Sequence, residues 1–335
     1  MRKLLLLLLS PLLLLSLPAV ALLFFYRAKT YRRRKGLQDY TVSSEHPLEL
    51  YFMQLSLCSS KVLFALEAAG IEVHKKEIDI GHFGRFEQLE SEFLRINPNA
   101  CVPVLVHEGK PILESDEILK YLASSLRPGC LTPPEQDREA TAIMQHWLDR
   151  GGFVDMHGTM GAKAGAAVAA LSAPLFAVDH RYMGLITLVK ALFKHPQPQI
   201  VVLKIANWFL GSVKPPPKMI DEAFSTLTSC FSDIETVLAQ NGKWLSGDTF
   251  TLADVTWAAN FVRLDMLGVL PFFLEDREHT RAYWSRLQQY PGFDEAFVQP
   301  FTQSTEFLEL QRVSTEAKQK VARSGAAAAY GWTSA

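Results

Sequence analysis

A thiol, several hydroxyls and an amine lie together in the run Ser56-Leu57-Cys58-Ser59-Ser60-Lys61. The residues before it, Leu48–Leu55, have the composition of a strand, and apolar residues recur at helical spacing from Val62 to Ala69. Cys58 is therefore expected at a helix N-terminus, where unpaired N–H groups and the helix dipole favour an anion and can lower the pKa of a thiol. The run predicts a nucleophilic thiol or, in the simpler alternative, a small buried hydrophobic residue.

The segments that must position this run alternate between strand-like and helical patterns. After the first strand and helix come a strand within Ile71–Ile80, a helical pattern over Phe83–Ile96, a hairpin of Val102–His107 and Pro111–Glu114, and a helix over Ser115–Ser125. The predicted order is β-α-β-α-β-β-α. Beyond residue 128 the strand patterns fade, and helices are expected over Glu135–Arg150, Asp221–Gln240, Arg281–Gln289 and Asp294–Gln299. A capping box at Thr251–Asp254, with Phe250 and Val255 as a hydrophobic staple, begins another helix.

This order resembles the glutathione S-transferase superfamily from about Pro47 to Gln311, and three local motifs carry the resemblance. Cys58 and its flanking serines lie where the family places its catalytic residue. Asn97–Leu105 is similar to the family's N-P-x-x-x-V-P-x-L signature, and Glu114–Ile118 is similar to its E-S-x-x-I motif. The resemblance implies an α/β thioredoxin-like N-terminal domain followed by an all-α C-terminal domain.

The same resemblance implies how glutathione, the expected co-substrate, would bind. Pro103 would follow a cis peptide bond, and the backbone of Val102 would pair with the cysteinyl part of glutathione. Glu114 and Ser115 would hold the γ-glutamyl end, since a helix N-terminus suits a carboxylate. Lys61 either helps to hold Cys58 as an anion or is a solvated surface lysine.

Two kinds of thiol chemistry are compatible with the run. A hydroxyl of Ser56 or Ser59 can donate a hydrogen bond to the glutathione sulfur and lower its pKa. Cys58 can instead attack the sulfur of a glutathione adduct, leaving a mixed disulfide that a second glutathione resolves. The run is most similar to that of tetrachlorohydroquinone reductive dehalogenases, which use the second chemistry. Cys101 is either a resolving thiol near the same site or a packing residue.

The first 26 residues predict a membrane anchor. Arg2 and Lys3 precede an apolar run from Leu4 to Tyr26, and roughly 20 apolar residues can span a bilayer as a helix. The basic cluster that follows predicts a single-pass protein whose domains face the cytosol, with the endoplasmic reticulum as one candidate membrane. A cleaved signal peptide, suggested by Ala19-Val20-Ala21, and an organelle-targeting peptide are the alternatives.

The predicted domain plan has five parts. They are the anchor 1–26, a basic linker 27–46, the glutathione-binding domain 47–127, the helical domain 128–314 and a flexible tail 315–335. Within the helical domain, residues 151–218 form an apolar insertion, read as extra core helices, a hydrophobic roof over the second substrate or a membrane-surface contact. Its two apolar runs are each too short to cross a bilayer.

Composition and charge exclude some classes of partner. The chain has 335 residues with a formal net charge of -1, which argues against nucleic acid as a partner. Its four cysteines form no C-x-x-C pair and its histidines have no ligand-like spacing, so no metal is expected. The sequence predicts a membrane-anchored glutathione S-transferase-like enzyme, with a homodimer as one assembly, that conjugates glutathione to a hydrophobic electrophile or removes a leaving group reductively. The alternative is a catalytically silent interaction protein with the same fold.

Overall fold

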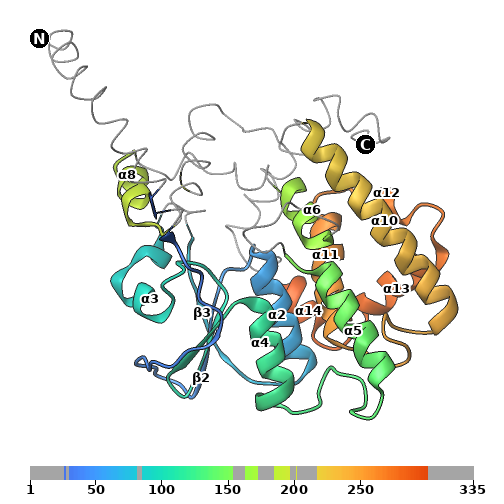
Figure 1. Ribbon diagram of the computed structural model, residues 1–335, viewed down its shortest axis with the longest axis horizontal. Helices are drawn as coiled ribbons and strands as arrows, with labels where there is room; N and C mark the ends of the chain where they lie inside the picture. Colours follow the sequence, from blue (N-terminus) through green and yellow to red (C-terminus); the bar gives the residue numbers. More distant parts are fainter. Residues whose placement is uncertain are drawn as a thin grey trace, which may run out of the picture.

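The computed structural model describes residues 26–27, 30–80, 85–153, 163–172, 185–196, 201 and 217–300. In these ranges an α/β domain with one five-stranded sheet is followed by a helical domain (Figure 1). No helix within them is long and apolar enough to cross a membrane. The predicted anchor, apart from Tyr26, and the predicted tail lie outside the described residues.

The sheet has the strand order β1-β5-β4-β2-β3. β2 (Leu48–Phe52) is parallel to β3 (His74–Glu77) and antiparallel to β4 (Val104–His107), and β4 is antiparallel to β5 (Lys110–Leu113). A parallel pair needs a crossover connection, and α2 (Leu57–Ala68) provides it. The predicted order of elements from β2 onward is therefore confirmed.

β1 (Gly36–Leu37) was not expected. These two residues pair antiparallel with Leu113 and Ile112, so a strand from the predicted basic linker occupies the outer edge of β5. The backbone groups of an edge strand are open to pairing, and the preceding chain uses them here. The assignment of residues 27–46 to a linker is thus wrong for the part that enters the sheet.

The two faces of the sheet are covered by different helices. α2 and α4 (Ser115–Tyr121) lie on the face toward the helical domain, and α3 (Ser91–Ile96) lies on the other (Figure 1). The helical pattern expected over 83–96 is divided, since η1 (Glu87–Leu89) precedes α3 and residues 81–84 lie outside the described ranges. A one-turn continuation, η2 (Leu122–Leu126), follows α4.

α11 (Leu252–Met266) is the central helix of the second domain and packs against α2. Trp257 Nε1–H in α11 donates to the Trp147 carbonyl at 3.0 Å, which fixes α5 (Arg138–Gly151) beside it. The predicted capping box is present, with the Thr251 N–H donating to Asp254 Oδ2 at 2.8 Å. The same domain also contains α10 (Pro217–Asn241), α12 (Leu270–Leu274), α13 (Glu278–Gln288) and α14 (Phe293–Phe297).

Two helices of the apolar insertion are described. α6 (Ala164–Leu171) is almost wholly buried against α10 and α11, as expected of an extra core helix. A Cβ added to Gly165 would lie 2.6 Å from the Gly152 carbonyl oxygen, so α6 approaches the end of α5 closely. α8 (Leu185–Lys194) lies beside the α3 side of the first domain (Figure 1), and Ala191 packs with Phe86 and Leu89 there.

Candidate active site

The turn between β2 and α2 exposes only part of the predicted run. Ser56 is the N-cap of α2, and its Oγ accepts from the Ser59 N–H at 3.3 Å. Cys58, in the first turn, is partly exposed. Ser59 is fully buried, and its hydroxyl accepts from the Met53 N–H at 3.3 Å. Ser56 and Cys58 are therefore reachable from outside the turn, whereas Ser59 supports the turn from within.

Lys61 is buried, so it is not the solvated surface lysine of the alternative interpretation. Its side chain is 6% exposed, and its ammonium forms an ion pair with the half-exposed Asp116 carboxylate in α4. Asp116 is the second residue of α4, where a carboxylate also suits the positive end of the helix dipole. The pair joins the starts of the two helices that flank the candidate site.

Burial dominates the electrostatics of Cys58. It raises the pKa of the thiol above its usual value, and the negative charges of Asp116 and Glu114 act in the same direction. The Lys61 ammonium and a hydrogen bond from the Ser115 side chain lower the pKa of Cys58 without cancelling the effect of burial. The lowered pKa expected from the helix N-terminus is thus wrong for this thiol.

Arg263 brings a second buried cation to the turn. It belongs to α11, is 5% exposed, and donates from Nη2 to the Leu55 carbonyl. Burial lowers the pKa of Arg263 to about 10, and its attraction to Cys58 opposes that change. No carboxylate among the described residues forms an ion pair with it. Sequence analysis missed Arg263, because nothing local in α11 indicates which residue faces a turn in the other domain.

The Val102–Pro103 peptide bond is cis, as the resemblance implied. Both residues are buried, and β4 begins immediately after them. Within the described part of the chain, no hydrogen bond reaches the N–H or the carbonyl of Val102. Buried backbone groups are nearly always paired, so this peptide is able to receive an extended peptide ligand.

Glu114 and Ser115 lie at the start of α4. Glu114 has the left-handed φ of 77°, and the helix begins at Ser115, which is 8% exposed. Glu114 Oε1 accepts from Asn99 Nδ2 at 3.1 Å and from Arg33 Nε at 2.7 Å. Because the Ser115 side chain also lowers the pKa of Cys58, the start of α4 contributes both to the predicted γ-glutamyl subsite and to the electrostatics of the thiol.

Cys101 borders the same site. Arg33 Nη2 lies 3.6 Å from its Sγ, and the Asn97 side chain lies 3.5 Å from it. Burial raises the pKa of Cys101 to about 12, so it is a weak source of thiolate. The charges of Glu114 and, to a smaller extent, Cys58 act in the same direction on the pKa of Cys101. Sequence analysis anticipated Cys101 there but not Arg33, which it assigned to the linker.

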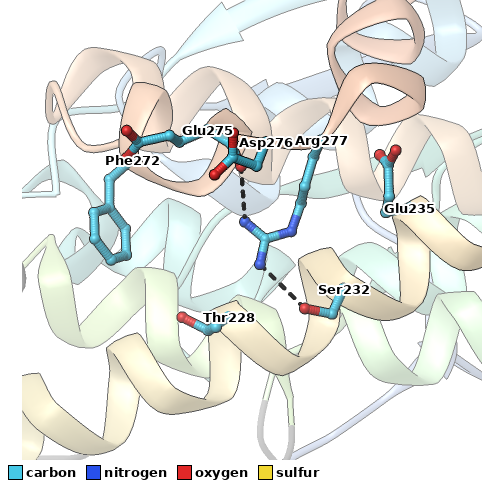
Figure 2. Close-up of a pocket in the computed structure, with 7 residues that line it drawn as sticks. All are labelled: Thr228, Ser232, Glu235, Phe272, Glu275, Asp276 and Arg277. Atoms are coloured by element: carbon cyan, nitrogen blue, oxygen red, sulfur yellow. Dashed lines mark hydrogen bonds between the residues drawn. The ribbon is translucent and has the colours of Figure 1, made fainter.

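One surface cavity lies elsewhere. It has a volume of about 410 Å³ and separates α10 from the turn between α12 and α13 (Figure 2). Arg277 spans it and donates to Ser232 Oγ at 3.1 Å. None of the predicted site residues lines this cavity; its lining consists of Thr228, Ser232, Glu235, Phe272, Glu275, Asp276 and Arg277. The described residues also contain no cluster of three potential metal ligands.

Two family models match the chain in the order that the fold displays. The glutathione S-transferase N-terminal domain matches residues 46–124, and the glutathione S-transferase C-terminal domain matches residues 218–292. The chain therefore belongs to the glutathione S-transferase superfamily. The predicted two-domain fold is confirmed, and so is the prediction of an enzyme of the glutathione transferase class.

The chain is also similar to individual members of this superfamily. The chain is 23% identical over 260 residues to tetrachloro-p-hydroquinone reductive dehalogenase of Sphingobium chlorophenolicum, covering 76% of this chain and 96% of that protein. It is 34% identical over 98 residues to glutathione S-transferase 1 of Dianthus caryophyllus, covering 29% of this chain and 43% of that protein. Among solved structures, β-etherase LigF from Sphingobium sp. strain SYK-6 aligns with a TM-score of 0.60 at 22% identity, covering 75% of this chain and 99% of that chain.

Proposed function

We propose that this protein binds glutathione between β4 and α4 and transfers it to a hydrophobic electrophile. The observation that carries the proposal is the unpaired, buried Val102 backbone beside the start of α4. The cysteinyl part of glutathione would pair with Val102, and the γ-glutamyl carboxylate would accept hydrogen bonds at Ser115, where the helix dipole favours it. The γ-glutamyl ammonium would bind Glu114.

In this arrangement the glutathione sulfur reaches the start of α2. The Ser56 hydroxyl caps the helix with its lone pair, which leaves its O–H to donate to that sulfur. Lys61 and Arg263 are both buried, and their positive charges would favour a thiolate there. This set supports conjugation in which Ser56 stabilises the glutathione thiolate and Cys58 lies beside it.

The similarity to a reductive dehalogenase supports a second step through Cys58. Cys58 would attack the sulfur of a glutathione–ring adduct, forming an S–S bond as the carbon–sulfur bond breaks. The expelled ring carbanion takes up one proton, matching the proton that the Cys58 thiol loses. A second glutathione thiolate then attacks the mixed disulfide, releasing oxidised glutathione and Cys58. The ring gains two electrons and two glutathione molecules lose them.

Mass spectrometry of the full-length protein, given glutathione and a quinone, separates the possibilities. A glutathione adduct on Cys58 that persists in Cys101→Ala and disappears in Cys58→Ala indicates the reductive step. Conjugation that survives in Cys58→Ala but falls in Ser56→Ala indicates simple transfer. Absence of both glutathione binding and conjugation contradicts the proposal and favours a catalytically silent interaction protein.

We also propose a location in the cell. The apolar run of residues 4–26 and the basic residues after it support a single-pass anchor with the two domains in the cytosol. A hydrophobic electrophile would then partition into the same membrane.

A further inference from the structure

The chain that precedes the family domain is clamped to the candidate site. The Arg34 N–H donates to Asn99 Oδ1 at 3.0 Å, and Asn99 Nδ2 donates back to the Arg34 carbonyl at 2.8 Å. The Tyr31 hydroxyl donates to the same Asn99 oxygen at 3.1 Å. With β1 paired to β5 immediately afterwards, residues 31–37 are bound along the edge of the site rather than loosely tethered to it.

This clamp carries the side chain of Arg33 onto Glu114. Nε donates to Glu114 Oε1 at 2.7 Å, a short charge-assisted bond, while Nη2 lies 3.6 Å from Cys101 Sγ. The guanidinium therefore spans the interval between Glu114 and the residue before Val102. In the proposed function, the γ-glutamyl part of glutathione has to cross that same interval.

Arg33 and the γ-glutamyl ammonium require the same partner. Both are cations, and Glu114 is the carboxylate that either would use. Its Oε1 already accepts from Arg33 and Asn99, and the Arg33 side chain is only 28% exposed. Like charges at one carboxylate repel each other, and two groups cannot fill one buried space. Occupation by Arg33 and full seating of glutathione are therefore alternatives.

We propose that Arg33 is a specificity-determining residue of the glutathione site: it occupies the Glu114 carboxylate in place of a ligand ammonium, and glutathione seats fully only when residues 31–37 yield. This inference rests on the proposed function, since it takes glutathione as the ligand of Glu114. It assigns the chain ahead of the family domain a direct influence on affinity.

The test is calorimetric titration of glutathione into the full-length wild type and three full-length variants. Arg33→Ala is expected to bind about tenfold more tightly than the wild type, because it removes a competing charged hydrogen bond. Arg34→Ala is the matched control: it removes one positive charge from the same segment, but its guanidinium lies over the Tyr40 ring, 5.6 Å from the ring centroid. The double variant Arg33→Ala/Glu114→Gln is expected to lose the gain, since the gain needs the carboxylate.

The outcomes distinguish the two proposals. Binding by Arg33→Ala that is equal to or weaker than wild-type binding overturns the role of Arg33 while leaving glutathione binding intact. Failure of all variants to bind glutathione overturns the proposed function, and the inference with it. Hydrogen exchange adds a direct readout, because saturating glutathione should speed exchange at the Arg34 and Gln38 amides, which are now bonded to Asn99 and to the Pro111 carbonyl. Unchanged protection at both amides would contradict displacement.

Discussion

The ammonium of Lys61 in α2 donates to the carboxylate of Asp116 in α4, and the two charges have opposite effects on the pKa of the Cys58 thiol. The Lys61 charge lowers that pKa, and the Asp116 charge raises it. Asp116→Asn removes a negative charge and leaves the Lys61 charge uncompensated, so the pKa of Cys58 should fall. Lys61→Met removes the positive charge and should raise that pKa. The measurement is the rate of Cys58 alkylation by iodoacetamide as a function of pH.

A Cys58→Ala variant supplies the background from the other three cysteines. Displacement of the alkylation profile in the same direction by both variants would show that the ion pair acts through the position of α4 rather than through charge.

Arg263 should act on the same thiol from the helical domain. Arg263→Met removes a buried cation near Cys58 and should slow alkylation at pH 8 roughly threefold, since less thiolate is present. Arg263→Lys keeps the charge and should recover most of the rate. Arg277→Met, which removes an arginine from the remote cavity of Figure 2, should leave alkylation unchanged. Equal rates for the Met and Lys variants would mean that Arg263 only supports the Leu55 carbonyl.

Gly165 should be essential for the packing of α6. An alanine Cβ would lie 2.6 Å from the Gly152 carbonyl oxygen and 2.7 Å from that of Gly151, and backbone atoms cannot move aside as a flexible side chain can. Gly165→Ala should therefore lower the free energy of unfolding by about 1–3 kcal/mol, as overpacking does. Urea denaturation measures this, with Gln145→Ala on the exposed side of α5 as a control near zero. An unchanged midpoint would contradict the close approach of α6 to α5.

Asp254 should make folding depend on pH. Burial raises its pKa to about 6 in the folded protein, from an ordinary value of 3.8. A group with a raised pKa contributes its stability fully below pH 4 and loses it as the pH rises through 6. The free energy of unfolding of the wild type relative to Asp254→Asn should thus fall by roughly 2 kcal/mol between pH 4 and pH 7. A difference that stays constant or grows over this interval would contradict the raised pKa.

The sequence predicted those parts of the site that depend on local patterns. The start of α2 within residues 56–61 and the start of α4 at Ser115 follow from local patterns, and the cis bond before Pro103 follows from the family resemblance. The motifs did not predict which side chains of the run are buried, and burial determines both the orientation of Ser59 and the pKa of Cys58. Ser59 points inward because one residue of helical rotation separates it from Cys58, and the Cys58 pKa rises because desolvation exceeds the effect of the helix N-terminus.

The sequence did not predict that Arg33 and Arg263 belong to the site, and the reason is different. Arg33 and Arg263 reach the site from segments that are distant from it in sequence, through a two-residue strand and through the packing of α11 on α2. Neither contact has a local signature, since an arginine in a basic stretch or on a helix is ordinarily solvated.

The pairing of β1 with β5 limits the distance between the end of the apolar run and the candidate site. Arg33 lies only seven positions after Tyr26, which is a reach of at most about 25 Å even when the chain is fully extended. Because β1 and the Asn99 clamp hold the chain immediately after that point, slack in residues 38–46 cannot lengthen the tether. The Arg33–Glu114 contact therefore stays within that distance of Tyr26, where the apolar run ends. Tension on the chain there would load the hydrogen bonds of Arg27 to the Phe193 and His195 carbonyls first, and those of Tyr31 and Arg34 to Asn99 next.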